Sequence, residues 1–229
     1  ETEVVFRILL FRLFNAIETW EYLAARTGFP TLRTYDVDSY GALLEERISG
    51  GETLFNPAYI MCANKAFGYD RKHMNYLALV RHMLDTGFVA KLVAAPTFAK
   101  VYELLRGYPL IGDFMAYQLA TDLNYSEVID FPENSFTMAG PGAVRGIAKC
   151  FIDTGGRSNE DVILWMVDHQ EREFERLGIR FASLWGRPLQ AIDCQNLFCE
   201  TDKYCRVAFP DVKSNRSRIK VKFRPTRGP

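Results

Sequence analysis

The stretch of sequence that decides the fold is residues 104–131, LLRGYPLIGDFMAYQLATDLNYSEVIDF. Its apolar spacing predicts a helix over Thr97–Arg106, a tight turn, and a second helix over Asp113–Leu123. Gly107 is a typical helix stop, and Asp113 can cap the helix that follows. The segment between the helices is too short and too apolar for an ordinary surface loop. These residues therefore predict a compact helical hairpin.

The hairpin and the residues after it, YPLIGDFMA from Tyr108 to Ala116, resemble the helix-hairpin-helix of base-excision DNA glycosylases. In that family the hairpin amides bind a DNA phosphate at a helix N-terminus, so the resemblance implies that Gly112 contacts DNA. Leu110 departs from the family pattern, because it stands where the first hairpin glycine is expected and its side chain would crowd a phosphate. An αα-hairpin in a helical core explains the segment equally well.

Asp130 follows the second predicted helix at the place where these glycosylases carry their catalytic aspartate. The resemblance implies that Asp130 stabilises positive charge at C1′ of the sugar or orients a water molecule. Bifunctional glycosylases carry a lysine two residues after the second hairpin glycine, and this chain has Phe114 there. The resemblance therefore implies a monofunctional glycosylase that forms no Schiff base.

Helical spacing of apolar residues dominates the rest of the chain, and β alternation is rare. With 229 residues, 48% of them hydrophobic, the chain can bury a substantial core. We expect a mainly α fold: one helical, DNA-glycosylase-like domain over residues 1–212 and a basic tail over residues 213–229. The other expected helices are a long first helix from Val4 that ends at Gly28, then Val37–Ile48, Arg71–Leu84, Gly142–Phe151, Ser158–Arg176 and Leu189–Tyr204.

The tail concentrates positive charge, although the whole chain has 28 basic and 28 acidic residues. Seven basic residues and no acidic residue lie in residues 213–229, KSNRSRIKVKFRPTRGP. Such a tail suits contacts with DNA phosphates, although a solvated chain end accounts for the charge equally well. The residues that we expect to contact DNA in the tail are Lys213, Arg216, Arg218, Lys220 and Lys222.

Cysteine and histidine usage favours no metal and no cofactor. Five cysteines, an odd number without a secretory leader, favour a reducing compartment, hence the cytoplasm, or the nucleus in a eukaryote. The spacing of Cys194, Cys199 and Cys205 does not match an iron–sulfur cluster, and the three histidines are too scattered for zinc. No apolar run reaches the length of a membrane span, so we expect no membrane contact, and we expect a monomer. The chain does not begin with methionine, which suggests a trimmed chain or one domain of a longer protein.

Polar motifs outside the hairpin carry a second resemblance. In chain order they are FRLFN from Phe11, AYIM with NK from Ala58 to Lys65, GYDRKH from Gly68, AGPGA from Ala139, and AIDCQNLFCETDKY from Ala191. Together they resemble the α-glutamyl/putrescinyl-thymine pyrophosphorylase superfamily, which includes the helical domain of phage 5-hydroxymethyldeoxyuridine DNA kinases. That superfamily is considered a divergent branch of the helix-hairpin-helix glycosylases. The resemblance covers about residues 5–210 and implies an enzyme that acts on modified pyrimidines in double-stranded DNA, in hypermodification or in defence against phage.

Two of these motifs suggest a site for a flipped base. Arg12 and Asn15 lie one turn apart on an apolar helix, so their burial requires either partners or a cleft. Tyr59, Asn64 and Lys65 lie in an aromatic and polar loop that could stack on a base and hydrogen-bond to it. Structural hydrogen bonds and ordinary loop anchoring remain open as the alternatives. We predict all five residues to bind substrate.

The last two motifs add further candidates. Gly140 and Gly142 can expose successive amides to a DNA phosphate at a helix N-terminus, although a plain turn accounts for them almost as well. In the C-terminal motif, Asp193, Asn196 and Glu200 share one helix face. Together with Gln195, they give a short apolar helix an unusual polar density. We predict these four residues to bind substrate as well.

Three functions compete at this point. The favoured one is a monofunctional DNA glycosylase, a hydrolase that flips and excises a modified pyrimidine with Asp130 as its catalytic residue. The second is a transferase that joins an amine or amino acid to an activated hydroxymethyl-thymine analogue. The third is a non-catalytic DNA-binding helical module of a base-modifying system. No GxxxxGK[ST] sequence occurs in the chain, so we do not expect it to be the kinase itself.

Overall fold

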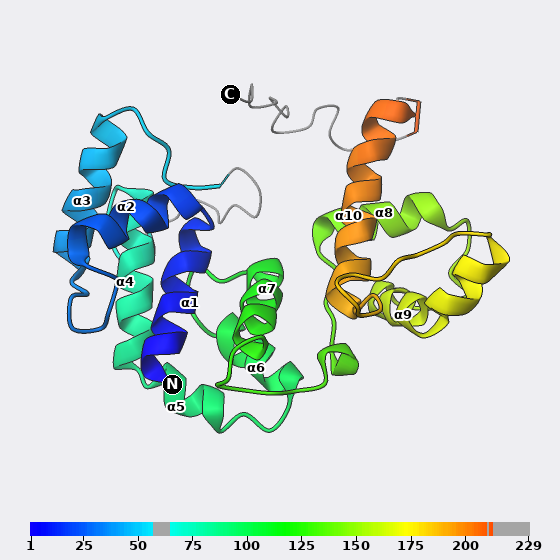
Figure 1. Ribbon diagram of the computed structural model, residues 1–229, viewed down its shortest axis with the longest axis horizontal. Helices are drawn as coiled ribbons and strands as arrows, with labels where there is room; N and C mark the ends of the chain where they lie inside the picture. Colours follow the sequence, from blue (N-terminus) through cyan, green and yellow to red (C-terminus); the bar gives the residue numbers. More distant parts are fainter. Residues whose placement is uncertain (57–64, 210, 213–229) are drawn as a thin grey trace. The chain divides into compact units, whose positions relative to one another are not determined.

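The computed structural model describes residues 1–56, 65–209 and 211–212, and these residues form a mainly helical fold, as predicted (Figure 1). The described part contains one isolated bridge, between Leu184 and Arg187, and no longer strand. Its helices are α1 (Thr2–Phe14), α2 (Ile17–Thr27), α3 (Val37–Ser49), α4 (Lys72–Asp85), α5 (Phe88–Val93), α6 (Phe98–Arg106), α7 (Asp113–Asn124), the 3-10 helix η1 (Glu133–Ser135), α8 (Pro141–Cys150), α9 (Asn159–Arg176) and α10 (Ala191–Ala208).

The helical domain consists of two compact units, Glu1–Pro132 and Glu133–Pro229. The first unit contains α1 to α7, and the second contains η1 and α8 to α10. The prediction of a single helical domain is confirmed, but sequence patterning did not reveal its division into two units.

Helix α1 forms the centre of the first unit, where it packs on α4 and α7 (Figure 1). Phe6, Leu9 and Leu10 of α1 are fully buried against this core. Their spacing of three and four residues places them on neighbouring positions of the helix surface. The largely apolar sequence of α1 therefore reflects burial within the unit.

The first predicted helix is broken into α1 and α2. Asn15 adopts a left-handed conformation with φ of 48°, and its backbone N–H donates to the carbonyl of Phe11. Ala16 is extended and serves as the N-cap of α2. Asparagine tolerates the left-handed region better than other non-glycine residues, so it can end a helix there. The prediction of one continuous helix to Gly28 is wrong for this reason.

The predicted hairpin is present, with boundaries within one residue of those expected. Thr97 caps α6 by accepting a hydrogen bond from the Lys100 amide, and α6 ends at Arg106 before Gly107. The chain then turns through Tyr108 to Gly112 and enters α7, and α6 packs on α7. The turn is closed by the Ile111 N–H, which donates to the Tyr108 carbonyl over 3.4 Å.

In the second unit, α8 lies directly against α10. A Cβ atom at Gly146 would stand 1.9 Å from the Phe198 carbonyl oxygen, and one at Gly142 would stand 2.4 Å from the Cys199 sulfur. The two glycines, one turn apart, therefore allow the helix backbones to approach closely. A cluster around Ile147, Ile163 and Phe198 fills the space between α8, α9 and α10.

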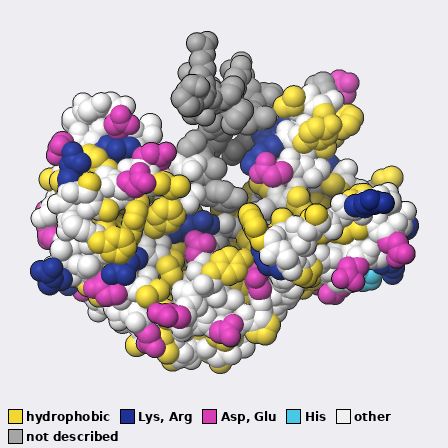
Figure 2. Space-filling model, in the orientation of Figure 1, with side chains coloured by type: hydrophobic (Ala, Val, Ile, Leu, Met, Phe, Trp, Pro, Cys, Tyr) yellow, Lys and Arg dark blue, Asp and Glu magenta, His cyan; other side chains and the backbone are white. Residues whose placement is uncertain are grey.

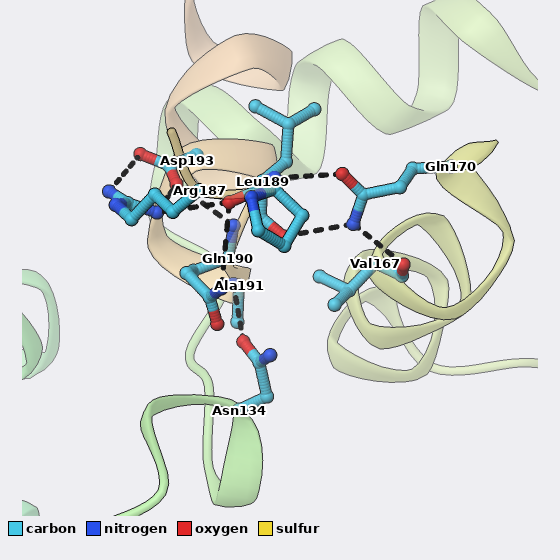
Figure 3. Close-up of polar contacts among 9 residues, drawn as sticks. Asn134, Val167, Gln170, Arg187, Leu189, Gln190, Ala191 and Asp193 are labelled. Carbon is cyan, nitrogen blue, oxygen red and sulfur yellow. Dashed lines mark hydrogen bonds and ion pairs between the residues drawn. The ribbon is translucent and has the colours of Figure 1, made fainter. Parts of the chain in front are cut away.

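Helix α9 begins with a capping box that Ser158 and Asp161 form. The Ser158 hydroxyl accepts from the Asp161 amide over 3.0 Å, and the Asp161 carboxylate accepts from the Ser158 amide over 3.2 Å. Farther along α9, the buried Gln170 forms two hydrogen bonds with the backbone of Leu189, just before α10 (Figure 3). These contacts fix the segment that leads into the C-terminal motif.

Candidate functional site

A cavity of about 330 Å³ opens on the first unit, beside α1, α2 and α7. Figure 2 shows hydrophobic side chains gathered over α1 and α2 on one face of this unit, with charged side chains beside them. The cavity has an aromatic and aliphatic wall and a charged edge. Its lining residues are Arg7, Ile8, Phe11, Arg12, Trp20 and Asp122.

The charged edge of the cavity is a cluster in which α7 holds the guanidinium of Arg12. The Arg12 Nε atom lies 3.1 Å from the Asp122 Oδ2 atom, and Arg12 Nη2 donates to the side-chain oxygen of Gln118. The Arg12 side chain is 13% exposed and that of Asp122 is 30% exposed. Arg12, for which the sequence left a cleft and structural partners open, therefore lines a cavity and also has polar partners on α7.

Asp122 and Gln118 both carry signs of an unusual environment. Burial raises the pKa of the Asp122 carboxyl group above its usual range, and the positive charge of Arg12 opposes that shift. Gln118 is 4% exposed, and its amide nitrogen is buried without a hydrogen-bond partner among the described residues. Buried groups of this kind are uncommon in folded proteins and concentrate at functional sites.

Neither Gln118 nor Asp122 was predicted from the sequence, although a signal was present. The two residues are spaced i, i+4 within α7, among mostly apolar neighbours. Such spacing places both polar side chains on one face. Their partner Arg12, however, lies 106 residues before Gln118, so only tertiary packing brings the three together.

The aromatic wall continues from the cavity to the surface. Phe11 and Trp20 make an edge-to-face contact with ring centroids 5.9 Å apart, and Trp20 makes another with Phe29 at 5.7 Å. The guanidinium carbon of Arg7 lies 4.8 Å from the centre of the Phe29 ring. A cation and a partly exposed aromatic surface therefore border the cavity.

Two other predicted base-contacting residues of the first unit, Asn15 and Lys65, are not among the residues that line this cavity. Asn15 serves as the left-handed cap of α1, which gives it a structural role. Lys65 forms an exposed ion pair with Asp70. Tyr59 and Asn64 lie outside the described residues. The substrate-binding roles of these four residues stay predictions.

The hairpin has open space beside Gly112, as a phosphate-binding turn would, but a carboxylate lies at the N-terminus of the helix that follows. A Cβ atom added at Gly112, the N-cap of α7, would meet nothing within 4 Å, so the space beside it is open. Asp113 follows in the first turn, and its carboxylate pairs with Arg106 and accepts from the Tyr102 hydroxyl over 3.1 Å. This carboxylate occupies the helix end that would attract a phosphate. A DNA contact at Gly112 stays a prediction.

Asp130 is exposed, and it is not among the residues that line the cavity. The residue after it is held by Asn124, whose side chain accepts from the Phe131 amide over 2.8 Å and donates to the Phe131 carbonyl over 2.9 Å. The apolar neighbours Val128 and Ile129 are buried. The carboxylate therefore faces solvent on a fixed turn.

The C-terminal motif of the second unit forms α10, and much of its polarity is structural. Asp193 closes a capping box with Gln190 and makes a bidentate ion pair with Arg187, at 2.6 and 3.3 Å (Figure 3). The Asn134 side chain accepts from the Ala191 amide at the start of the same helix. Asp193 thus orders the N-terminus of α10.

The remaining predicted residues of α10 do not face one site. Gln195 is buried and donates to the side-chain oxygen of Asn196 over 2.8 Å, whereas Glu200 is exposed and pairs with Lys203. Their substrate-binding roles, and that of Asp193, stay predictions. A contact of Gly140 with a phosphate is likewise untested, and Gly142 faces Cys199 of α10, which explains its lack of a side chain.

Asp202 adds to the polar density of the C-terminal motif, and three cations of the described part of the second unit surround its carboxylate. Its buried carboxylate lies 2.6 Å from Lys149 Nζ, 3.0 Å from Arg145 Nε and 3.6 Å from Arg206 Nη2. Burial opposes ionisation of Asp202, but hydrogen bonds from Lys149 and Arg145 lower its pKa below the usual value. This network connects α8 to α10.

Two classes of site receive no support from the described residues. Residues 1–56, 65–209 and 211–212 contain no group of three or more His, Cys, Asp or Glu side chains placed to hold a metal ion. Within the same ranges, no helix is both long and apolar enough to cross a membrane. The basic residues of the tail, Lys213, Arg216, Arg218, Lys220 and Lys222, lie outside the described residues.

Comparison with known proteins identifies the family. Residues 1–214 match the family described as the helical domain of 5-hmdU DNA kinase, where 5-hmdU is 5-hydroxymethyldeoxyuridine. The chain belongs to this family. The helical domain is 28% identical over 210 residues to the 5-hmdU DNA kinase of Bacillus phage SP10. The match covers 85% of the chain but only 33% of that relative, and no solved structure matches.

These findings correct the functional prediction. The relative is named for a kinase, a transferase, so the prediction of a glycosylase, a hydrolase, is wrong. The resemblance to helix-hairpin-helix glycosylases led to the wrong reaction, because a shared hairpin predicts a fold and not the chemistry that the fold carries out. The role given to Asp130 depended on base excision and loses its chemical basis. The predicted transferase alternative is closer, because a kinase also transfers a group.

Proposed function

We propose that this helical domain binds DNA that contains 5-hydroxymethyluracil and presents the modified base for phosphorylation of its hydroxymethyl group. The family match over residues 1–214 carries the proposal. The chain spans about a third of the SP10 kinase, so the phosphoryl transfer is assigned to a longer protein or a complex that contains this domain. The domain itself supplies recognition of DNA and base.

The chemical requirements of phosphoryl transfer and of base recognition support the assignment of these two functions to different parts of the longer protein or complex. Phosphoryl transfer needs a site for the phosphates of a nucleoside triphosphate, and the chain contains no GxxxxGK[ST] sequence. Recognition of a modified base needs a concave site with aromatic walls and a few fixed polar groups. The first unit offers such a site, beside Phe11, Trp20 and the Arg12–Asp122 pair.

A binding experiment tests the proposal. Three duplexes of one sequence would carry thymine, 5-hydroxymethyluracil or 5-hydroxymethylcytosine at a single central position, and fluorescence anisotropy would give the Kd of each at one fixed salt concentration. We expect the tightest binding to the 5-hydroxymethyluracil duplex. Equal dissociation constants for thymine and 5-hydroxymethyluracil would contradict the proposal, and so would tighter binding to 5-hydroxymethylcytosine.

A further inference from the structure

We infer that the cavity beside α1, α2 and α7 binds the base of one extrahelical pyrimidine nucleotide, and that Asp122 accepts a hydrogen bond from its 5-hydroxymethyl group. This inference rests on the proposed function and names the site and the residue that would distinguish the modified base from thymine. It involves one unit only, because every residue of the cavity lies within residues 1–132.

The size and the walls of the cavity suit a single base. Its volume of about 330 Å³ lies near the lower end of the range for small-molecule sites, roughly 300–1,000 Å³. Ile8, Phe11 and Trp20 provide apolar and aromatic surface on which a planar base can stack. Stacking on aromatic side chains is the usual way in which proteins hold an unpaired base.

The charged edge supplies the discriminating group. Asp122 contacts Arg12 through Oδ2, and an ionised carboxylate can accept about four hydrogen bonds, so acceptor capacity remains for a ligand in the cavity. Thymine carries a methyl group at C5, whereas 5-hydroxymethyluracil carries a hydroxyl donor there. A hydrogen bond to a partly buried carboxylate is stronger than one between neutral groups, so it would favour the modified base.

The surroundings of Asp122 hold its carboxylate in place. Arg12 contacts Asp122 and donates to Gln118, and the two α7 residues lie one turn apart on one helix. Arg12 is therefore a positioning residue for the acceptor. Arg7, with its side chain 35% exposed, also lines the cavity, and its guanidinium lies 3.6 Å from the Glu3 carboxylate. A partly exposed guanidinium of this kind can contact the backbone phosphate of the bound nucleotide.

The experiment compares the ratio of the thymine-duplex Kd to the 5-hydroxymethyluracil-duplex Kd across four proteins. Asp122→Asn keeps the shape of the side chain and removes its charge, and we expect the ratio to fall by about tenfold. Trp20→Leu removes the stacking surface, and we expect it to weaken binding to the 5-hydroxymethyluracil duplex by about tenfold. Asp85→Asn is the matched control, because Asp85 forms an exposed pair with Arg81 on α4, away from the cavity. We expect the control to bind like the wild type.

The outcomes separate this inference from the proposed function. A wild-type protein with no preference for 5-hydroxymethyluracil would contradict the proposed function. A preference that survives Asp122→Asn, or an affinity for the 5-hydroxymethyluracil duplex that Trp20→Leu leaves unchanged, would overturn the inference alone and place recognition elsewhere. Circular dichroism melting of each variant checks folding, and Trp20→Leu provides the test if Asp122→Asn fails to fold. The inference would also be overturned if an apolar peptide bound in the cavity and did not compete with either duplex for the protein.

Discussion

Leu110 holds a backbone conformation that glycine adopts with little strain. Its φ is +67°, and it follows Pro109 at the third position of the turn that Ile111 closes onto Tyr108. Turns with Pro at the second position and positive φ at the third favour glycine there. The helix-hairpin-helix pattern has glycine at this position, so the backbone of the turn is kept although its usual residue is not.

Substitutions at Leu110 test this strain directly. Leu110→Val should lower the free energy of unfolding by about 2 kcal/mol, because a β-branched residue at positive φ is a steric outlier. Leu110→Gly should stay within about 1 kcal/mol of the wild type, because relief of strain offsets the missing side chain and the added chain entropy. Urea denaturation measures both values. Equal losses for the two variants would mean that side-chain packing, and not backbone strain, decides stability at this position.

Asp202 is a second residue whose surroundings predict a measurable effect. Asp202→Asn should lower the free energy of unfolding by about 3 kcal/mol near pH 7, because it leaves Lys149 and Arg206 buried with a neutral partner. The folded pKa of Asp202 is below the reference value of 3.8, so its stabilisation is present above that value and is lost as the pH falls through the folded pKa. The difference in stability between wild type and variant should therefore shrink below about pH 4. A difference that stays constant from neutral pH to well below the reference pKa would contradict this assignment.

At the scale of the elements, the contact between α8 and α10 depends on Gly146. Gly146→Ala should lower the free energy of unfolding by about 2 kcal/mol or more, since its Cβ would meet the Phe198 backbone at 1.9 Å and force the helices apart. Gly50→Ala is the matched control, because Gly50 has φ of −73° and its Cβ would make only ordinary contacts, at 3.4 Å or more. Thermal unfolding compares the two variants. A destabilisation in Gly146→Ala no larger than in Gly50→Ala would show that α8 can move away without cost.

Helix ends could be predicted from the sequence where neighbouring residues form the cap. The candidate site beside Arg12 could not be predicted in full. Thr97 and the Ser158–Asp161 pair act through neighbouring residues, so their caps appear in the sequence as they do in the structure. The break at Asn15 was missed because one asparagine within an apolar pattern is a weak stop signal, although asparagine tolerates the left-handed conformation. The short helix α5 was not expected either. At the cavity, Arg12 was a candidate from the sequence, but its partners on α7 are set by tertiary packing.

At the scale of the whole molecule, the division into two units separates two kinds of polar cluster. The Arg12–Asp122 pair in the first unit borders a cavity, whereas the Asp202 network and the Arg187–Asp193 pair in the second unit connect helices and cap them. Polar density in a motif therefore does not distinguish a binding site from a structural network. For the Arg12–Asp122 pair, the additional observation is the cavity that it borders.

The basic tail belongs to the same scale, because we expect any contacts that it makes with DNA phosphates to add to those of residues 1–212. Removal of residues 213–229 should weaken binding to all duplexes alike and lower the slope of log K against log salt concentration by roughly 0.9 for each DNA phosphate that the tail neutralises in the intact protein. The preference for 5-hydroxymethyluracil over thymine should not change, because phosphate contacts carry no base information. A full-length variant with serine at Lys213, Arg216, Arg218, Lys220 and Lys222 separates charge from chain length, and it should match the truncated protein. An unchanged slope in both proteins would show that the tail is only a solvated end, and a weakened base preference would show that it takes part in recognition.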